Sequence, residues 1–427
     1  MCYRGFTVGL RAIIIAAGTA CSAIAVSAEG QEMPVRRVSI EEALRLFATN
    51  NLELRISRAT AAQSTGLARQ QSAYPNPGLL LSHESVSSAV ADHSETYFNL
   101  SQRVDWPWMT AARRHAASSR AAAGRAQVSA DSIRLAYDVL RTFMEAATSE
   151  QVTATMAEAA ALVGRAETQA TARAAAGDVS GYELRRLRIE RARYENELSG
   201  ATLAMRAARR RLAALVLPDS SVEVSPVALA DQVPASITLT SVLDAGSQEH
   251  PLVAEATAST EAAEALRRAA GAERLPSPAV TAGYKRQSDG LSGPYLSAGI
   301  SVPLFDRRGA AVSAAVAEED VARIRADLVT RNVSNDIRNA FDRYEAARTR
   351  LVSLGAGGLA ATDTLLSIAR VSYAEGEMSL VELLDAVGAY RTARIAATEV
   401  RANAWTTFYD LERASGMPLG GRAPEAR

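Results

Sequence analysis

The chain has 427 residues, enough for two or three ordinary domains or for one elongated one. Hydrophobic residues make up 48% of it and aromatic residues only 5%, and much of the apolar content is alanine, which suits closely packed helices better than the core of a globular enzyme. Lys and Arg together number 47, as do Asp and Glu, so there is no basic surplus to favour a nucleic-acid partner.

Residues 1–28 are typical of a signal peptide, with a basic start, a short apolar core and a small-residue cleavage site that ends at Ala28. Cleavage there would remove both cysteines, Cys2 and Cys21. The alternative is a lipoprotein whose first mature residue is an acylated Cys21, although Gly18 stands where a large aliphatic residue is usual. No later apolar run approaches the ~20 residues of a membrane helix. We therefore expect an exported chain without disulfides or membrane-spanning helices.

An internal repeat organises the remaining chain. Three short segments return in the same order about 200 residues later, which indicates a tandem duplication. The paired segments are Ser39–Glu42 and Ser241–Asp244, Tyr74–Pro77 and Leu275–Pro278, and Gly177–Leu184 and Gly376–Leu383. The predicted divisions are a first repeat over 29–217, a linker or equatorial segment over 218–240, a second repeat over 241–417 and a C-terminal tail over 418–427.

Both repeats predict the same elements. Ser39 and Ser241 each begin a capping-box pattern that opens a helix of about 35 residues, and a proline pair ends that helix. Two short β-like segments follow, and then about 66 residues without an internal proline, over 110–175 and 309–374. A Gly-containing turn and a helix of about 37 residues complete the unit. Because a 66-residue helix is about 100 Å long, the two shorter helices placed end to end would match it.

The last helix of the first repeat carries a coiled-coil seam. Its apolar residues are spaced alternately four and three apart, which predicts packing along the whole length. We interpret this stripe as core packing rather than as a binding site. The seam consists of Tyr194, Leu198, Ala201, Met205, Ala208, Leu212 and Leu215.

The β-like segments alternate apolar residues with small or polar ones. This pattern fits transmembrane β-barrel strands, and it also occurs in soluble sandwiches. Four strands cannot close a barrel, which needs about eight, and open sheet edges are not tolerated in lipid. If these strands cross a membrane, the chain must therefore oligomerise. The side chains predicted to line the lumen are Asn99, Ser101, Arg103, Thr281, Lys285, Ser297 and Ser301.

Candidate catalytic groups are missing from the sequence. The four histidines (His83, His93, His115 and His250) are scattered, and no two of them have the helical spacing of metal ligands. No phosphate-binding loop, nucleophile elbow or zinc-protease motif is present. We therefore expect neither an enzyme nor a cofactor.

The duplicated unit behind a signal peptide resembles the TolC-like family of outer-membrane efflux proteins. The most specific stretch is Tyr373–Ala386, which is similar to the family's tip motif. Val104–Pro107, followed by Arg113 and Arg114, resembles a segment of the branch that serves cobalt–zinc–cadmium efflux, although Trp108 replaces the usual glycine.

The resemblance implies a mainly helical fold with a small β part, assembled as a homotrimer with a periplasmic α-barrel and a shared 12-stranded transmembrane β-barrel. It implies a place in outer-membrane lipid with a large periplasmic portion. The partners would be a periplasmic adaptor and an inner-membrane RND-type pump. The channel would conduct substrate passively, heavy-metal cations first, with drug efflux or type I secretion as the alternative. A structural periplasmic coiled-coil protein is the alternative from another class.

The resemblance also assigns roles at the tips of the long helices. Glu382, Asp385 and Tyr373 match residues of the closed entrance, although Met378 stands where well-studied members place an arginine. Without the resemblance, the two acids would be interpreted as a solvated helix face.

The tip turns are the predicted docking edge for the adaptor. Each turn contributes a glycine and the serine that begins the next helix. These residues are Gly177, Ser180, Gly376 and Ser379.

Overall fold

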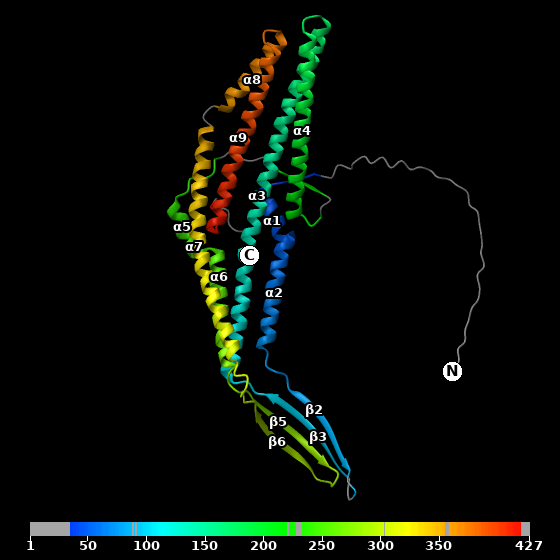
Figure 1. Ribbon diagram of the computed structural model, residues 1–427, viewed down its shortest axis with the longest axis vertical. Coiled ribbons are helices and arrows are strands. Elements are labelled where there is room, and N and C mark those ends of the chain that lie inside the picture. Colours follow the sequence, from blue (N-terminus) through cyan, green and yellow to red (C-terminus); the bar gives the residue numbers. More distant parts are fainter. Residues whose placement is uncertain are drawn as a thin grey trace, which may run out of the picture.

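The computed structural model describes residues 35–87, 89, 92–219, 222–227, 233–302, 304–354 and 358–419. The predicted signal peptide, including Cys21, lies outside these residues. The chain is a long bundle of helices with a β-sheet at one end (Figure 1). The expectation of a mainly helical fold with a small β part is confirmed.

The two halves of the chain contain similar elements in similar order. The first half consists of β1 (Val35–Val38), α1 (Ile40–Asn50), α2 (Leu52–Ser72), β2 (Gly78–Ser87), β3 (Asp92–Arg103), α3 (Pro107–Ala175), α4 (Gly181–Val216) and β4 (Glu223–Pro226). The second half consists of α5 (Leu239–Glu249), α6 (Pro251–Ala272), β5 (Pro278–Gln287), β6 (Ser292–Ile300), α7 (Gly309–Leu354), α8 (Gly358–Glu375) and α9 (Leu380–Ser415).

Helix α3 spans 69 residues without a break, which corresponds to about 100 Å. Pro107 occupies its first turn, where the missing N–H costs nothing. Helices α2 and α4 both pack on α3, and they follow one another along its length (Figure 1). The predicted end-to-end stacking of the shorter helices is confirmed in this half. In the second half, α7 and α8 occupy the stretch predicted as one long helix, and residues 355–357 between them lie outside the described part.

The first helix of each unit is divided in two, which the sequence analysis did not predict. Asn51 ends α1, and its side chain accepts a hydrogen bond from the backbone N–H of Leu54 at 2.9 Å to cap α2. His250 does the same between α5 and α6, where its Nδ1 accepts from Leu252 N–H at 3.1 Å. The following Pro251 cannot supply an N–H to continue α5.

The predicted capping role of Ser39 is confirmed, because its hydroxyl accepts a hydrogen bond from Glu42 N–H at 3.2 Å. The equivalent role of Ser241 is wrong. Helix α5 begins at Leu239 after Thr238, and the Ser241 hydroxyl instead donates back to the carbonyl of Thr238. The helix therefore begins three residues earlier than a cap at Ser241 would place it.

Two hydrophobic clusters hold the helices together. One lies around the helix breaks and contains Phe47, Phe143, Leu212, Tyr344 and Phe408. The other lies toward the tips and contains Tyr194, Leu187 and Tyr373. No residue of the predicted α4 seam is exposed, so its interpretation as a packing face is confirmed.

Two sheets are present among the described residues. A small parallel pair, β1 with β4, lies beside the first cluster and was not predicted from the sequence. The larger sheet is antiparallel and has the order β2-β3-β5-β6, so the two halves of the chain meet between β3 and β5. Within the described residues, no helix is both long enough and apolar enough to cross a membrane.

Candidate functional site

The larger sheet has one apolar and one polar face. Directly paired residues of an antiparallel sheet point to the same side, so the register assigns the faces. Ser101, Thr281 and Ser297 are consecutive partners across the sheet, and Asn99 lies on the same face two residues along β3. Arg103 and Lys285 share this face, and Ser301 follows the end of β6. The register thus places the six predicted lumen residues that lie within strands on one side.

The opposite face is largely apolar and uncovered, although Gln102 and Arg286 also belong to it. Leu79 is 81% exposed and Leu296 is 75% exposed, values that are unusual for leucine in a folded chain. Together with other apolar residues of this face, the two leucines form a continuous apolar surface across all four strands. Its members are Leu79, Leu81, Phe98, Leu100, Val280, Ala282, Tyr284, Leu296, Ala298 and Ile300.

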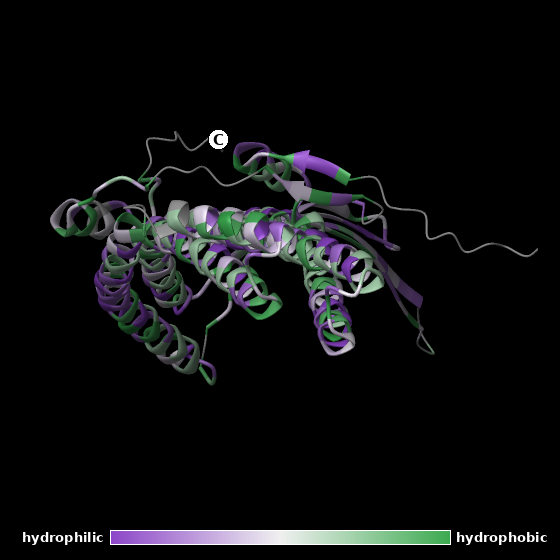
Figure 2. Cartoon of the chain, turned by 90° about the horizontal axis from the view of Figure 1, so that it is seen from above, coloured by the Kyte–Doolittle hydropathy of each residue, from purple (hydrophilic) through white to green (hydrophobic). Residues whose placement is uncertain are grey.

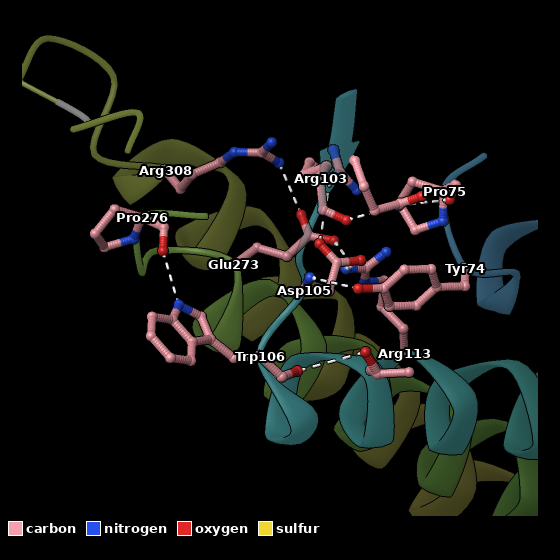
Figure 3. A network of polar contacts seen from close by, with 11 residues as sticks. Tyr74, Pro75, Arg103, Asp105, Trp106, Arg113, Glu273, Pro276 and Arg308 are labelled. Atoms are coloured by element: carbon pink, nitrogen blue, oxygen red, sulfur yellow. Dashed lines mark hydrogen bonds and ion pairs between the residues drawn. The ribbon is translucent and has the colours of Figure 1, made fainter. Parts of the chain in front are cut away.

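A polar network joins this sheet to the helices (Figure 3). Asp105 is buried between two arginines: Arg113 Nη2 donates to its Oδ2 at 2.5 Å, and Arg103 Nε lies 3.2 Å from its Oδ1. The indole N–H of Trp106 donates to the carbonyl of Pro276 at 2.8 Å and so links the two halves of the chain. The segment around residues 104–107 that carries the heavy-metal resemblance therefore has a structural role at this junction.

The two tip turns have nearly the same geometry. Gly177 has φ 89° and Gly376 has φ 82°, in the left-handed region that favours glycine. Ser180 and Ser379 each cap the next helix in a complete capping box with the acid three residues later. Both turns lie at the end of the molecule farthest from the larger sheet (Figure 1).

The predicted entrance residues separate into two groups. Glu382 and Asp385 are exposed and lie one turn apart on α9. Glu382 accepts hydrogen bonds from the Ser379 hydroxyl at 2.8 Å and from the Ser379 N–H at 2.9 Å, and these bonds lower the pKa of its carboxyl group. Tyr373, by contrast, is only 5% exposed and packs inside the tip cluster, where burial raises the pKa of its hydroxyl.

Arg173 is a contact at the tips that the sequence analysis missed. Its Nη1 donates to the carbonyl of Tyr373 at 3.4 Å, and its guanidinium lies over Gly376. The helical hairpin formed by α3 and α4 is therefore joined to the helical hairpin formed by α8 and α9 close to both turns. No spacing rule signals such a contact, because the two residues lie 200 apart in the chain.

The helices lie side by side in an extended row (Figure 2), with α2, α3, α6 and α7 as successive neighbours near the sheet. The molecule is thus a row of long helices that ends in a sheet with one polar and one exposed apolar face.

Comparison with known proteins identifies this architecture. Residues 242–417 match the family described as "Outer membrane efflux protein". The cobalt-zinc-cadmium resistance protein CzcC of Cupriavidus metallidurans is 22% identical over 384 residues, which cover 89% of this chain and 90% of that protein. The resemblance to TolC-like outer-membrane efflux proteins, and to their heavy-metal members, is confirmed.

Solved structures of outer-membrane channels share the fold. CmeC of Campylobacter jejuni superimposes with a TM-score of 0.74 at 18% identity, covering 91% of this chain and 87% of that one. CusC superimposes with a TM-score of 0.72 at 17% identity, covering 89% of this chain and 92% of that one. Both of these solved proteins are channels: CmeC is an outer-membrane channel, and the CusC structures concern formation of a transmembrane channel.

Proposed function

We propose that this chain is the outer-membrane channel of a tripartite efflux pump. It conducts its substrate passively from a periplasmic adaptor and an inner-membrane RND-type pump to the exterior. The observation that carries the proposal is the larger sheet, whose exposed apolar face suits lipid and whose polar face suits water. This sheet is attached to helices long enough to reach about 100 Å from it.

The assembly that fits this sheet is a homotrimer. Strands β2 and β6 are open edges, and unpaired backbone groups are costly in lipid. Pairing β6 of one copy with β2 of the next would close a ring without edges, and three copies would supply 12 strands, above the minimum of about eight. The similar order of elements in the two halves supports a tandem duplication, with the repeats at 29–217 and 241–417.

The far ends of the helices form the entrance in this proposal. The turns at Gly177–Ser180 and Gly376–Ser379 are the docking edge for the adaptor's helical tips. Glu382 and Asp385 supply six carboxylates around the threefold axis, and such a ring attracts cations into a narrow bore.

The proposed substrates are heavy-metal cations, on the strength of the similarity to a cobalt-zinc-cadmium resistance protein. Deletion of the gene should lower tolerance to these metals, and the intact gene should restore it. If tolerance to metals is unchanged while tolerance to drugs or secretion of a protein is lost, the drug-efflux or type I secretion alternative is correct.

Cysteine cross-linking tests the assembly. Both natural cysteines lie in the predicted signal peptide, so the mature chain provides a cysteine-free background. A cysteine at Ser82 on β2, combined in turn with cysteines along β6, should give covalent trimers at one register in outer-membrane fractions. A cysteine at Tyr97 on the interior strand β3, combined with the same β6 series, is the control and should give no cross-linked trimer. Recovery of the protein as a soluble monomer would instead support the structural coiled-coil alternative.

A further inference from the structure

A cluster of charged and aromatic side chains lies on the polar face of the larger sheet, close to the hairpin ends of its strands. Glu95 on β3 is the direct partner of Gln287, the last residue of β5. Next to it, the backbone N–H of Ser94 donates to the hydroxyl of Ser288 at 3.0 Å. The cluster therefore lies at the end of the sheet opposite the helices (Figure 1).

Glu95 is the centre of the cluster. Lys285 Nζ lies 2.8 Å from its Oε1, and the Gln287 amide donates to the same oxygen at 2.5 Å. The Tyr97 hydroxyl donates to Oε2, and His93 Nε2 lies 3.1 Å from Oε1. The carboxylate is thus satisfied from several sides and pairs directly with the ammonium group.

The aromatic part of the cluster fixes Lys285 in place. Its ammonium group lies 5.4 Å from the centre of the Tyr97 ring, within the range of a cation–π contact. Tyr97 and Tyr295 meet edge to face at 6.3 Å, and the Tyr295 hydroxyl donates to Asn99. A Cβ at Gly283 would come within 2.5 Å of the Tyr295 ring, so the ring can lie across this strand only because the residue is glycine.

The charges on this face suggest a role for the cluster in ion selectivity. Lys285 is the only lysine in the sequence, and Glu84, directly opposite Glu95 in the register, adds a second carboxylate. An unpaired ammonium group on each of three copies would oppose the passage of cations. We propose that Glu95 is a specificity-determining residue of the channel exit, which neutralises Lys285 and keeps the polar face open to cations. This inference rests on the proposed function, because it takes the polar face to be the lumen.

Selectivity measurements in planar bilayers test the proposal. A unit charge about 8 Å from a permeating ion in water changes the local ion concentration about two- to threefold. Because the same charge acts oppositely on potassium and chloride, Glu95→Gln should lower the potassium-to-chloride permeability ratio about four- to ninefold at low salt, by that same ~8 Å argument, and Lys285→Gln should raise it by a similar factor. The double variant should return close to the parent. Arg286→Gln is the matched control, because this neighbouring cation lies on the opposite face of the sheet.

A second measurement does not depend on the assembly of the variants that remove a charge. Acetylation of the assembled parent channel removes the charge of Lys285, and it should raise the same permeability ratio. Lys285→Arg is the control for this reaction, because it keeps the charge and is not acetylated. The N-terminal amine reacts equally in both proteins and therefore does not contribute to the difference.

The outcomes separate the two proposals. A parent protein that forms no conducting pore contradicts the proposed function. A conducting parent whose selectivity is the same before and after acetylation overturns the assignment of Glu95 and Lys285 alone, and so does a Glu95→Gln channel with the parent's selectivity.

Discussion

Glu382 helps to cap the start of α9, and this local role is independent of its proposed role at the entrance. Its carboxylate closes the capping box with Ser379, just as Glu183 does with Ser180 in the other tip turn. The two turns differ three residues further on, where Asp385 in the second half corresponds to Arg186 in the first. This difference allows the cap and the entrance to be tested separately.

Glu382→Gln combined with Asp385→Asn should weaken block of the channel by divalent cations added on the periplasmic side, because the acidic ring loses its charge. The effect should be largest at low salt, since the Debye length falls from about 10 Å at 0.1 M to about 3 Å at 1 M. Glu183→Gln is the control: it removes the same charge from the equivalent capping box of the other tip turn, but it should leave the block unchanged. Equal block in the parent and the double variant would show that the two acids are only a solvated helix face.

The charge of Glu382 is present throughout the neutral range. Its hydrogen bonds with Ser379 lower the pKa of the carboxyl group below its ordinary 4.5. The stabilisation of the cap is therefore complete above pH 4.5 and is lost only as the pH falls through the lower value of the folded protein.

The sequence predicted the turn glycines at the tips, but it did not predict the contacts between the helices there. Gly177 and Gly376 were found because a left-handed turn requires a residue without a Cβ, and this requirement is visible in one residue. The burial of Tyr373 was not found, because it depends on a cluster that includes residues of other helices, such as Ala170 and Leu187. The contact of Arg173 is equally non-local.

At the scale of elements, the two helix breaks use different chemistry for the same purpose. Asn51 caps α2 with an amide oxygen, which does not titrate, whereas His250 caps α6 with a ring nitrogen, which does. Carbonyl groups of Arg413 and Ala414 near the end of α9 hydrogen-bond the His250 ring, and Gly416 packs closely on it. Burial lowers the pKa of His250 below 6.5 and the charge of Arg413 lowers it further, whereas the hydrogen bonds to these carbonyl groups and the charge of Asp336 on α7 oppose the shift.

This arrangement predicts that the cap of α6 in the second half weakens in acid, whereas the cap of α2 in the first half does not. Because the pKa of the folded state is depressed, the unfolded state takes up the proton first as the pH falls below 6.5, and stability is lost below that value. Protonated Nδ1 also can no longer accept the N–H of Leu252. Between pH 7.5 and 5.5, hydrogen exchange should therefore accelerate in peptides covering 239–254 more than in those covering 40–55, after correction for intrinsic rates.

His250→Asn provides the matched variant, since Asn51 shows that an asparagine can make this cap. The variant should abolish most of the extra pH dependence, although it loses the bonds to the α9 carbonyls. If peptides 239–254 of the variant exchange with the same pH dependence as those of the parent, His250 is not the titrating group.

The missed helix breaks show what signals at the ends of a helix leave out. The capping patterns at Ser39 and Ser241 and the proline pairs that follow mark only the outer ends, so they predict one helix through Asn51 or His250. The local signals were present, as an Asn cap in one case and a residue before proline in the other. The long helix α3 was predicted within three residues at its start because nothing within it favours a break.

At the scale of the molecule, the two hairpins reach the same end (Figure 1), and the proposed docking requires both turns to meet the adaptor together. Inserting seven residues into each arm of the α3–α4 hairpin alone would lengthen it by about 10 Å and keep the heptad phase. Metal tolerance and adaptor cross-linking should be lost, whereas the same insertion in both hairpins should retain trimers and partly restore cross-linking. Full tolerance with one lengthened hairpin would exclude docking at paired turns.

The unbroken α3 makes the chain a lever. One helix begins at the sheet junction, where Asp105 and Trp106 fasten it, and ends at the tip turn that contains Gly177. Over about 100 Å, a pivot of only about 5° at the fastened end would carry the free end sideways by about 9 Å. Small adjustments at the sheet end are therefore magnified at the tips. The accuracy with which the tips are positioned depends on how firmly a few side chains hold the junction.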